Sequence, residues 1–338
     1  MDKRQKLGQF RYIPWIALVQ IAIISFPYAV KAAAQVSPGQ SAALQSTDQT
    51  PVTPGERETA TDDSDDDVET MFPHLSNTRY WLSGQANFIF QSNPGFYAKY
   101  SGPHSLNPHF DRALSRVITV YTGLQLNDST ELLVDLEEAG GSALSTGLGL
   151  AGFTNLDIVR NPQLSKAPYP ARAMVHKVFA LSKDKIENQR NALSLFEELP
   201  RRRLEVRFGK FSMADFIDVN SAGSDTHLQF MNWTVDNNGA WDYAADTRGY
   251  TVGAVVDFED RNWGIRFAEA LMPKVANGID LVWRPWQVHA ENWEYELRHG
   301  FIPHKAGAVR ALAYTNYANM GDLPAGDCAI QPAPCSHS

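Results

Sequence analysis

Short segments in which apolar and polar residues alternate recur along the chain from residue 80 onward. In residues 130–138, the apolar side chains of Leu132, Val134 and Leu136 share one face, and three carboxylates share the other. A period of two is typical of a β-strand whose two faces meet different surroundings. Clusters of Gly, Asn, Pro and Asp separate these segments, which predicts a series of β-hairpins.

The alternation predicts nine strands in an all-β, antiparallel fold. It is clearest in residues 130–138, 203–211 and 250–258, and weaker in the other segments. The predicted strands are residues 80–90, 114–126, 130–138, 171–181, 203–211, 250–258, 263–271, 288–298 and 306–317.

Three segments depart from the regular pattern. In residues 288–298, His289 and Glu291 break the phase of the later residues, and a bulge or a strand end near Asn292 would explain the change. Residues 186–199 have a mildly helical spacing and are predicted to be a loop insertion. Residues 213–248 are long, polar and aromatic, which predicts an ordered loop rather than strands.

Both a soluble β-sandwich and a membrane β-barrel contain alternating strands, so the distribution of side chains must separate them. A sandwich buries its apolar faces, whereas a barrel turns them to lipid and keeps its polar faces around a lumen. Aromatic residues at the ends of the predicted strands favour the barrel, because such residues form belts at membrane interfaces. They are Tyr80, Trp81, Phe88, Phe90, Tyr250, Phe258, Trp263 and Trp286.

Residues 1–34 are predicted to be a cleaved signal peptide. Basic residues precede an apolar run over residues 12–30, and Ala32, Ala33 and Ala34 supply small residues for cleavage. A permanent membrane anchor is the alternative, because the apolar run is long enough to span a bilayer. No other stretch is apolar enough to be a membrane helix, so any later insertion would use strands.

The segments on either side of the strands lack their pattern. Residues 35–70 are rich in Ser, Thr and Pro, and carry an acidic run at residues 62–67, which predicts a disordered periplasmic linker. Calcium binding by this run is the alternative, but the Gly and Glu of an EF-hand loop are absent. Residues 322–338 are predicted to be an irregular tail, and Cys328 and Cys335 within it to be incidental.

The formal net charge of −8 at pH 7 argues against a nucleic-acid partner, which would need neutralisation of phosphates. A mean hydropathy of −0.31 does not exclude a membrane protein, because a barrel turns half of each strand toward water. A small neutral or cationic partner therefore fits better than a nucleic acid.

Motifs that would indicate an enzyme have simpler interpretations here. Residues 147–152 satisfy the G-x-G-x-x-G pattern, but a Gly/Ser/Thr-rich run follows in place of a helix. Glu137 and Glu138 are adjacent and point to opposite faces of a strand, so they cannot flank one glycosidic bond. The histidines lack the spacing of a zinc site. We therefore predict no catalytic residue, no metal and no cofactor.

Charged side chains on the polar faces of the predicted strands are the candidate substrate-binding or pore-lining residues. A Lys or Arg on the lipid face near the bilayer midplane costs about 2–4 kcal/mol, so these residues are expected to face a lumen or an interface. A generic hydrated lining is the alternative to specific sugar contacts. The candidates are Glu131, Asp135, Glu137, Arg203, Glu205, Arg207, Asp257, Glu294, Glu296 and Arg298.

Several pieces of the chain, in order, resemble the carbohydrate-selective porin family (OprB-type). They are residues 168–172 (PYPAR), 199–205 (LPRRRLE), 209–212 (GKFS), 218–220 (DVN), 229–233 (QFMNW), 238–243 (NGAWDY) and 246–250 (DTRGY). The resemblance covers roughly residues 80–321. It brings in a second set of candidate residues in the long loop, namely Asn232, Trp233, Asn238, Trp241, Asp242, Asp246 and Arg248.

The resemblance implies a sixteen-stranded outer-membrane barrel, formed here by residues 71–321, that passes monosaccharides by facilitated diffusion. It implies no covalent chemistry and no cofactor. The expected partners are small sugars, outer-membrane lipid and further copies of the chain in a homo-oligomer. A secreted sugar-binding or sugar-cleaving β-sandwich and a polysaccharide-export barrel are the alternatives.

The number of predicted strands departs from the family pattern. Nine strands use about 26 residues each with their connections, so seven more would need on the order of 180 further residues. The final aromatic residue typical of such barrels is also missing. These observations lead to the expectation of a C-terminally truncated member of the family.

Overall fold

The structure, a computed structural model, describes the part of the chain that forms the predicted strands. The described residues are 35–37, 74, 77–102, 105–147, 164, 167–220, 223–224, 237–276, 278–298 and 307–318. The predicted signal peptide, the predicted C-terminal tail and nearly all of the predicted linker lie outside them.

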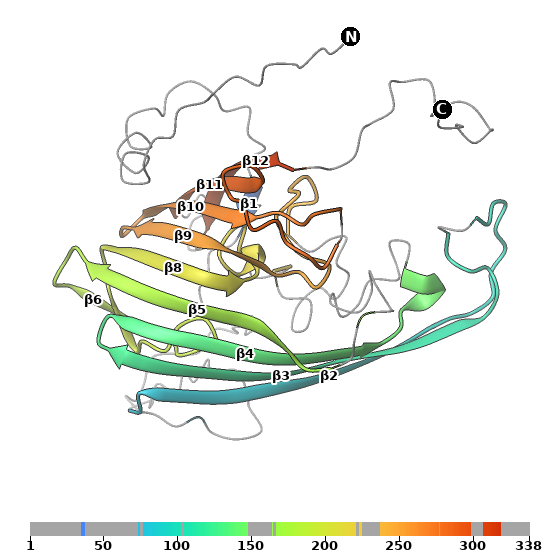
Figure 1. The fold of residues 1–338 in the computed structure, drawn as a ribbon, viewed down its shortest axis with the longest axis horizontal. Helices are drawn as coiled ribbons and strands as arrows, with labels where there is room; N and C mark the ends of the chain where they lie inside the picture. The colour runs from blue at the N-terminus through green and yellow to red at the C-terminus, as the bar shows by residue number, and fades with distance from the viewer. Residues whose placement is uncertain are drawn as a thin grey trace, which may run out of the picture. The chain divides into compact units, whose positions relative to one another are not determined.

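The strands form one antiparallel sheet, in which neighbouring long strands pair in chain order (Figure 1). All nine predicted strands are confirmed, and the prediction of an all-β, antiparallel fold holds for the described residues. They are β2 (Tyr80–Asn93), β3 (Asp111–Asn127), β4 (Thr130–Gly141), β5 (Tyr169–Ala180), β8 (Arg203–Phe211), β9 (Thr251–Glu259), β10 (Trp263–Leu271), β11 (His289–Arg298) and β12 (Ala308–Tyr317). A short strand, β1 (Gln35–Ser37), pairs with β12.

Residues 186–199 lie in the connection between β5 and β8, in line with the predicted loop insertion, and β6 (Lys185–Glu187) and β7 (Glu198–Pro200) pair there as a short hairpin. Phe196, Leu199 and Ile186 of this connection pack with Val178 of β5 in a small core. The irregularity predicted near Asn292 is wrong. No bulge occurs near Asn292, because β11 pairs residue by residue with both β10 and β12.

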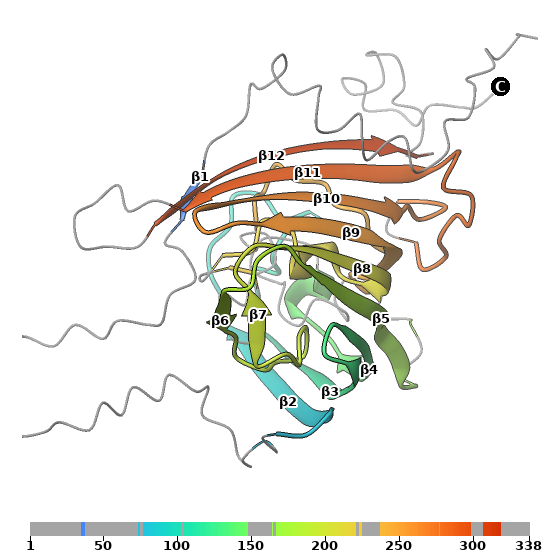
Figure 2. The ribbon, with the colours of Figure 1, turned by 90° about the vertical axis from the view of Figure 1, so that its left-hand side faces the viewer.

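The two faces of the sheet differ in polarity. We call the face covered by residues 181–202, 212–220 and 237–250 the inner face, and the opposite face the outer face (Figure 2). In β4, Glu131 and Asp135 on the inner face are fully buried, whereas Leu132 and Leu136 on the outer face are exposed. In β8, Phe208 on the outer face is 64% exposed. The sheet therefore buries charge and exposes apolar side chains.

An apolar core lies between the middle of the inner face and the loop that follows β8. The 3-10 helix η2 (Met213–Asp215) begins this loop, and Met213, Phe216 and Ile217 from it are buried. Trp241 and Ala244 from the later part of the loop join the same core. The sheet contributes its inner-facing apolar residues, which are Trp81, Leu133, Met174, Phe211, Val255, Ala268, Ala270 and Ala290. Burying a large apolar side chain stabilises a protein by about 1.5–3 kcal/mol, so this core fixes the loop to the sheet.

Connections at the two ends of the strands differ in length. Residues 128–129 and 260–262 form tight turns at one end, which also holds residues 181–202 and 299–307. Residues 94–110, 142–168, 212–250 and 272–288 connect the strands at the other end, each with 17 residues or more, so both tight turns lie at the first end. We call these the short-turn end and the long-loop end. Among the described residues, no helix is long and apolar enough to cross a membrane.

Gly209 occupies a backbone position that a side chain would disturb. Its φ of +140° is one that residues with a Cβ rarely adopt, and a Cβ there would lie 2.2 Å from the carbonyl oxygen of Ala173. We predict that Gly209→Ala lowers the free energy of unfolding by more than about 1 kcal/mol, measured by chemical denaturation. Gly239→Ala is the matched control, because a Cβ at Gly239 meets no atom within 4 Å. Equal stability of the two variants would contradict the prediction.

Candidate functional site

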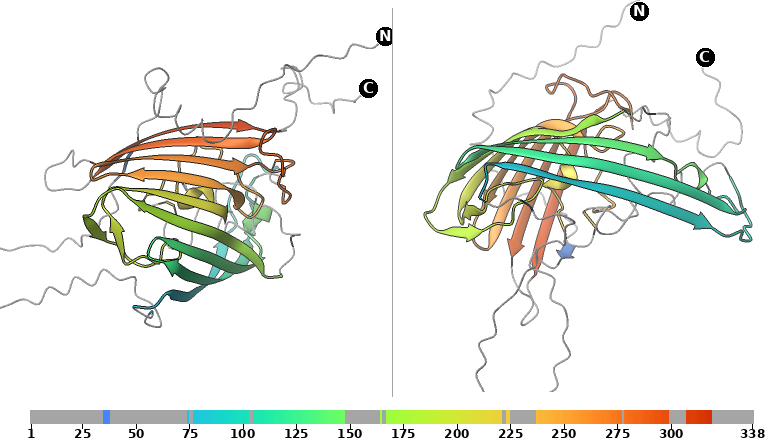
Figure 3. Two further views of the ribbon diagram at one scale, coloured as in Figure 1. Left: turned by 60° about the vertical axis from the view of Figure 1, so that its left-hand side comes forward. Right: turned by 90° about the horizontal axis from the view of Figure 1, so that it is seen from below.

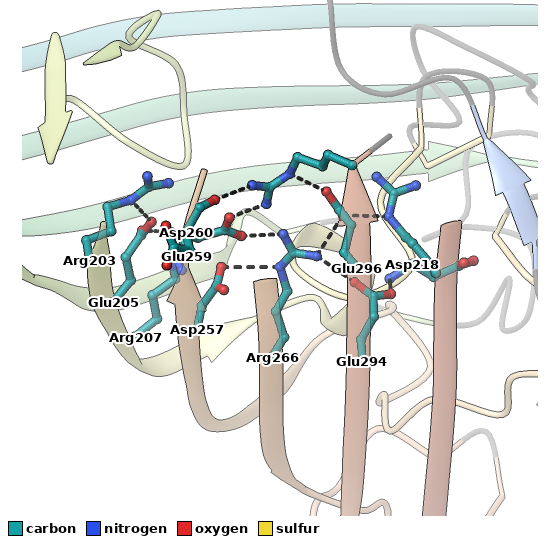
Figure 4. Close-up of polar contacts among 12 residues, drawn as sticks. Arg203, Glu205, Arg207, Asp218, Asp257, Glu259, Asp260, Arg266, Glu294 and Glu296 are labelled. Carbon is teal, nitrogen blue, oxygen red and sulfur yellow. Dashed lines mark hydrogen bonds and ion pairs between the residues drawn. The ribbon is translucent and has the colours of Figure 1, made fainter. Parts of the chain in front are cut away.

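Arg266 lies at the centre of a group of carboxylates on the inner face of β9, β10 and β11 (Figure 4). Its Nη2 donates to Glu259 Oε1 at 2.6 Å, and its Nε donates to Asp257 Oδ2 at 3.2 Å. Its Nη1 donates to Glu294 Oε1 at 2.7 Å and to Glu296 Oε2 at 3.1 Å. The antiparallel register explains this meeting, because Arg266 pairs directly with Asp257 on one side and Glu294 on the other.

Further arginines surround this group and complete its neutralisation. Arg298 donates from Nε to Glu296 Oε1 at 2.6 Å and also bonds Glu259 through Nη2. Arg310 on β12 donates to Glu296 Oε2 at 2.7 Å. On β8, Arg203 and Arg207 both bond Glu205. We call this set the arginine–carboxylate network; its members are Arg203, Glu205, Arg207, Asp257, Glu259, Arg266, Glu294, Glu296, Arg298 and Arg310.

The network contains five arginines and five carboxylates, which come from the neighbouring strands β8, β9, β10, β11 and β12. Its side chains are nearly all buried, since most of them are less than about one sixth exposed. A buried charge without a partner is expensive, so matching the two signs is what allows so many charges on one face. The inner face is therefore strongly polar there without carrying a net charge.

The network also holds the long loop against the sheet. Glu294 Oε2 accepts a hydrogen bond from the backbone N–H of Asp218 at 2.7 Å. Asp218 in turn accepts one from the backbone N–H of Asn238 through Oδ2 at 2.6 Å. Burial raises the pKa of the Asp218 carboxyl above its usual value, and the bond from Asn238 opposes that shift. Glu294 thus holds the start of the loop to the inner face, and Asp218 links that point to Asn238 near the middle of the loop.

His176 on β5 bridges the network to β4. Its Nδ1 lies 2.7 Å from Glu131 Oε1, and its Nε2 lies 2.8 Å from Glu205 Oε2, with all three side chains buried. Both bonds form to ionised carboxylates only when both ring nitrogens carry a proton. The other oxygen of Glu131 accepts from the backbone N–H of Leu195 at 2.9 Å. This bridge therefore fixes residues 181–202 to the inner face.

A second polar group lies nearer the long-loop end, around Glu137. Its carboxylate accepts hydrogen bonds from Thr119 Oγ1 at 2.9 Å, from the Tyr169 hydroxyl at 2.5 Å and from the Tyr250 hydroxyl at 3.2 Å. The Arg248 guanidinium lies over the Tyr169 ring, 3.7 Å from its centroid. The group thus combines aromatic faces, hydroxyls and a carboxylate.

Arg172 on β5 links this second group to the start of the loop. Its guanidinium makes two hydrogen bonds to Asp215, of 2.6 and 2.7 Å, and one to Asp135 Oδ2 of 3.1 Å. It also lies over the Tyr250 ring, 5.7 Å from its centroid. A bidentate pair between an arginine and a carboxylate is geometrically specific, so Arg172 fixes the position of η2 on the inner face.

The candidate residues in residues 212–250 bond partly to the sheet and partly within the loop. Trp241 Nε1 donates to Asn292 Oδ1 on β11 at 2.8 Å, and the ring is buried. Asp246 accepts from the backbone N–H groups of Arg248 and Tyr250, at 2.8 and 3.1 Å. Burial raises the pKa of Asp246, and the bonds from Tyr250 and Arg248 oppose the shift.

The structure brings most of the predicted pore-lining residues together on the inner face. Arg203, Glu205, Arg207, Asp257, Glu294, Glu296 and Arg298 belong to the arginine–carboxylate network, and Glu131 joins it through His176. Asp135 and Glu137 belong to the second group. Asp242 is exposed and accepts from Asn316. Asn232 and Trp233 lie outside the described residues.

Sequence reasoning missed Arg266, Glu259, His176, Arg172 and Arg310. Arg266 lies in a predicted strand, but the inward neighbours on its strand are Gly264 and Ala268, so no charged face was visible. Glu259 directly follows the predicted strand end at residue 258. The signal that would have found Arg266 is the strand register, since its carboxylates come from two other strands.

Comparison with known proteins does not add a family. A scan against models of protein families gave no match, and a search of curated proteins found no relative. Within the part of the chain that the structure describes, no group of three or more His, Cys, Asp or Glu side chains is arranged to hold a metal ion.

Removal of Arg266 would leave buried carboxylates without their shared partner. We predict that Arg266→Met lowers the free energy of unfolding by about 3–5 kcal/mol, the usual cost of breaking a buried ion pair from one side. Arg202→Met is the control, because Arg202 is half exposed beside Asp260, and we expect a change below about 1 kcal/mol. Chemical denaturation of both variants measures the difference. A loss of unfolding free energy in Arg266→Met no larger than that in the control would contradict the role of Arg266 as the shared partner of these carboxylates.

Proposed function

We propose that the chain forms the wall of an outer-membrane β-barrel that lets small neutral sugars diffuse through it, as in carbohydrate-selective porins. The observation that carries this proposal is the polarity of the sheet, with charge buried on its inner face and apolar side chains exposed on its outer face. A water-soluble protein rarely exposes a large apolar face, whereas a membrane barrel must turn one to lipid.

The outer face carries an apolar band next to the short-turn end. From the short-turn end of β8, β10 and β11, the outward positions are apolar until Lys210, Glu269 and Glu291. At about 3.3 Å per residue, seven residues reach roughly 23 Å along the strand, which a strand tilt of about 35–45° reduces to roughly 16–19 Å along the membrane normal. This apolar band is shorter than the roughly 25 Å of typical outer-membrane barrels, and its position on the outer face of neighbouring strands supports a lipid-facing surface.

Outward aromatic side chains near the short-turn end support the same orientation. The Trp263 ring lies 5.1 Å from the Phe258 ring and 6.4 Å from the Tyr295 ring. Tryptophan and tyrosine concentrate at membrane interfaces, where one part of the ring system meets lipid and the other meets water. Both tight turns lie at the same end of the sheet, as is typical of outer-membrane barrels, although residues 181–202 form a longer connection at that end.

The choice of neutral sugars rests on the inner face and on the family resemblance. The arginine–carboxylate network presents polar groups without net charge, so it favours neither anions nor cations strongly. The second group adds the Tyr169 and Tyr250 rings, and aromatic rings and hydroxyls suit the faces and edges of sugars. The motifs of residues 209–250 resemble those of carbohydrate-selective porins, which supplies the substrate class.

Sugar entry into liposomes tests the proposal directly. We predict that the purified full chain, reconstituted into liposomes, makes them swell in glucose faster than in the trisaccharide raffinose. Liposomes that carry heat-denatured protein are the control. A swelling rate equal to that control contradicts the porin proposal, and equal rates for glucose and a long polysaccharide would favour an export channel instead.

The outer face allows a test that separates a membrane barrel from a secreted protein. We predict that Phe208→Arg reduces recovery in the outer-membrane fraction, because an arginine facing lipid is unfavourable, by about 2–4 kcal/mol at the midplane and less toward the interfaces. In a soluble protein, replacing this exposed phenylalanine would leave solubility unchanged or improve it. Asn262→Arg, in the exposed turn between β9 and β10, is the control. Unchanged membrane recovery of Phe208→Arg would refute a lipid-facing outer surface.

A further inference from the structure

The hairpin of β2 and β3 extends beyond the end of β4. β4 ends at Gly141, which pairs with Ser115, whereas β3 begins at Asp111. The hairpin continues into its connection, because Phe96 donates from its backbone N–H to Pro108 O at 2.9 Å. The extended strands form a long arm at one side of the sheet (Figure 3). We call residues 88–116 the hairpin arm, of which the structure describes residues 88–102 and 105–116.

The hairpin arm exposes an unusual number of large apolar side chains. Each of them is between 42% and 87% exposed, and most are aromatic. They are Phe88, Phe90, Phe96, Tyr97, Tyr100, Phe110 and Leu114. Exposed apolar patches of this kind mark surfaces that contact a partner or a membrane.

The charge of the hairpin arm is opposite in sign to that of the whole chain. Residues 88–116 contain Lys99, Arg112 and Arg116 but only one acidic residue, Asp111, whereas the chain has a net charge of −8. Asp111 Oδ2 accepts from the backbone N–H of Ser145 at 2.8 Å. Lys99 and Arg112 are exposed and make no ion pair with any described residue. The arm thus offers two accessible cations among aromatic rings.

The position of these residues continues the outer face past its apolar band. Phe88, Phe90 and Leu114 alternate with inward residues, as the apolar positions nearer the short-turn end do. Arg116 pairs in register with Phe88 and makes two hydrogen bonds to Glu138, of 2.8 and 3.2 Å. This ion pair is the first outward charge on β3 and β4 beyond the apolar band, so the arm begins where lipid tails would give way to headgroups.

We propose that the hairpin arm binds anionic, phosphate-bearing lipid headgroups, with Lys99 and Arg112 contacting the phosphates and the aromatic rings lying at the headgroup level. This inference rests on the proposed membrane location and names the lipid class that the surface selects. Interleaved aromatic and basic side chains fit that layer, because it is both partly apolar and negatively charged.

Lipid selection by the full chain tests the proposal. The protein in a zwitterionic detergent is mixed with phosphatidylglycerol or phosphatidylcholine, and the bound lipid is counted by native mass spectrometry. We predict that phosphatidylglycerol is preferred and that the double variant Lys99→Gln/Arg112→Gln reduces this preference about thirtyfold, since each of the two surface cations contributes on the order of 1 kcal/mol. The control is Lys183→Gln/Arg261→Gln, which removes the same charges from exposed residues at the short-turn end.

The outcomes separate this proposal from its alternatives. Equal loss in both double variants would overturn it, because net charge alone would then explain lipid selection. No preference for phosphatidylglycerol in the unaltered chain would also overturn it. The same holds if the unaltered chain is a dimer that dissociates in Lys99→Gln/Arg112→Gln but not in the control variant, because the arm would then bind a second copy. Since the measurement does not depend on sugar entry, a chain that selects anionic lipid but fails to conduct sugar would refute the porin function and leave this inference standing.

Discussion

Buried charge on the inner face must be balanced within the protein, and the rest of the structure depends on this constraint. The long loops cover much of that face, so its carboxylates and guanidinium groups have limited access to water. Desolvated ions are stable only when they are paired and hydrogen-bonded. Arg266 meets this requirement for four carboxylates at once. The surrounding arginines then balance the remaining negative charge of the carboxylates.

The same polar groups also decide where the loops lie. Glu294 binds the loop after β8 through the backbone of Asp218, and Glu131 binds the connection after β5 through the backbone of Leu195. Each carboxylate uses one oxygen for a side chain of the sheet and the other for a backbone N–H of a loop. The same side chains therefore balance the charge of the inner face and hold the loops in place. The apolar core around Trp241 and Met213 supplies the remaining stabilisation.

Sequence analysis found the strands because their period of two is a local property, read from neighbours along the chain. It could also assign Leu132 and Glu131 to different faces, since adjacent residues in a strand point in opposite directions. It failed for β6 and β7, whose three-residue strands are too short to show a period. It could not find Arg266 or His176 as central residues, because their partners come from other strands and only the register brings them together.

The direction of the edge strands has a consequence for closing the sheet into a cylinder. Each neighbouring pair is antiparallel, and nine long strands follow in order, so β2 and β12 run in the same direction. Direct pairing of these two would be parallel, unlike every other pair in the sheet. The short strand β1 runs opposite to β12 and so also opposite to β2. Residues Gln35–Ser37 thus make the strand count even, which is the parity that an uninterrupted antiparallel cylinder requires.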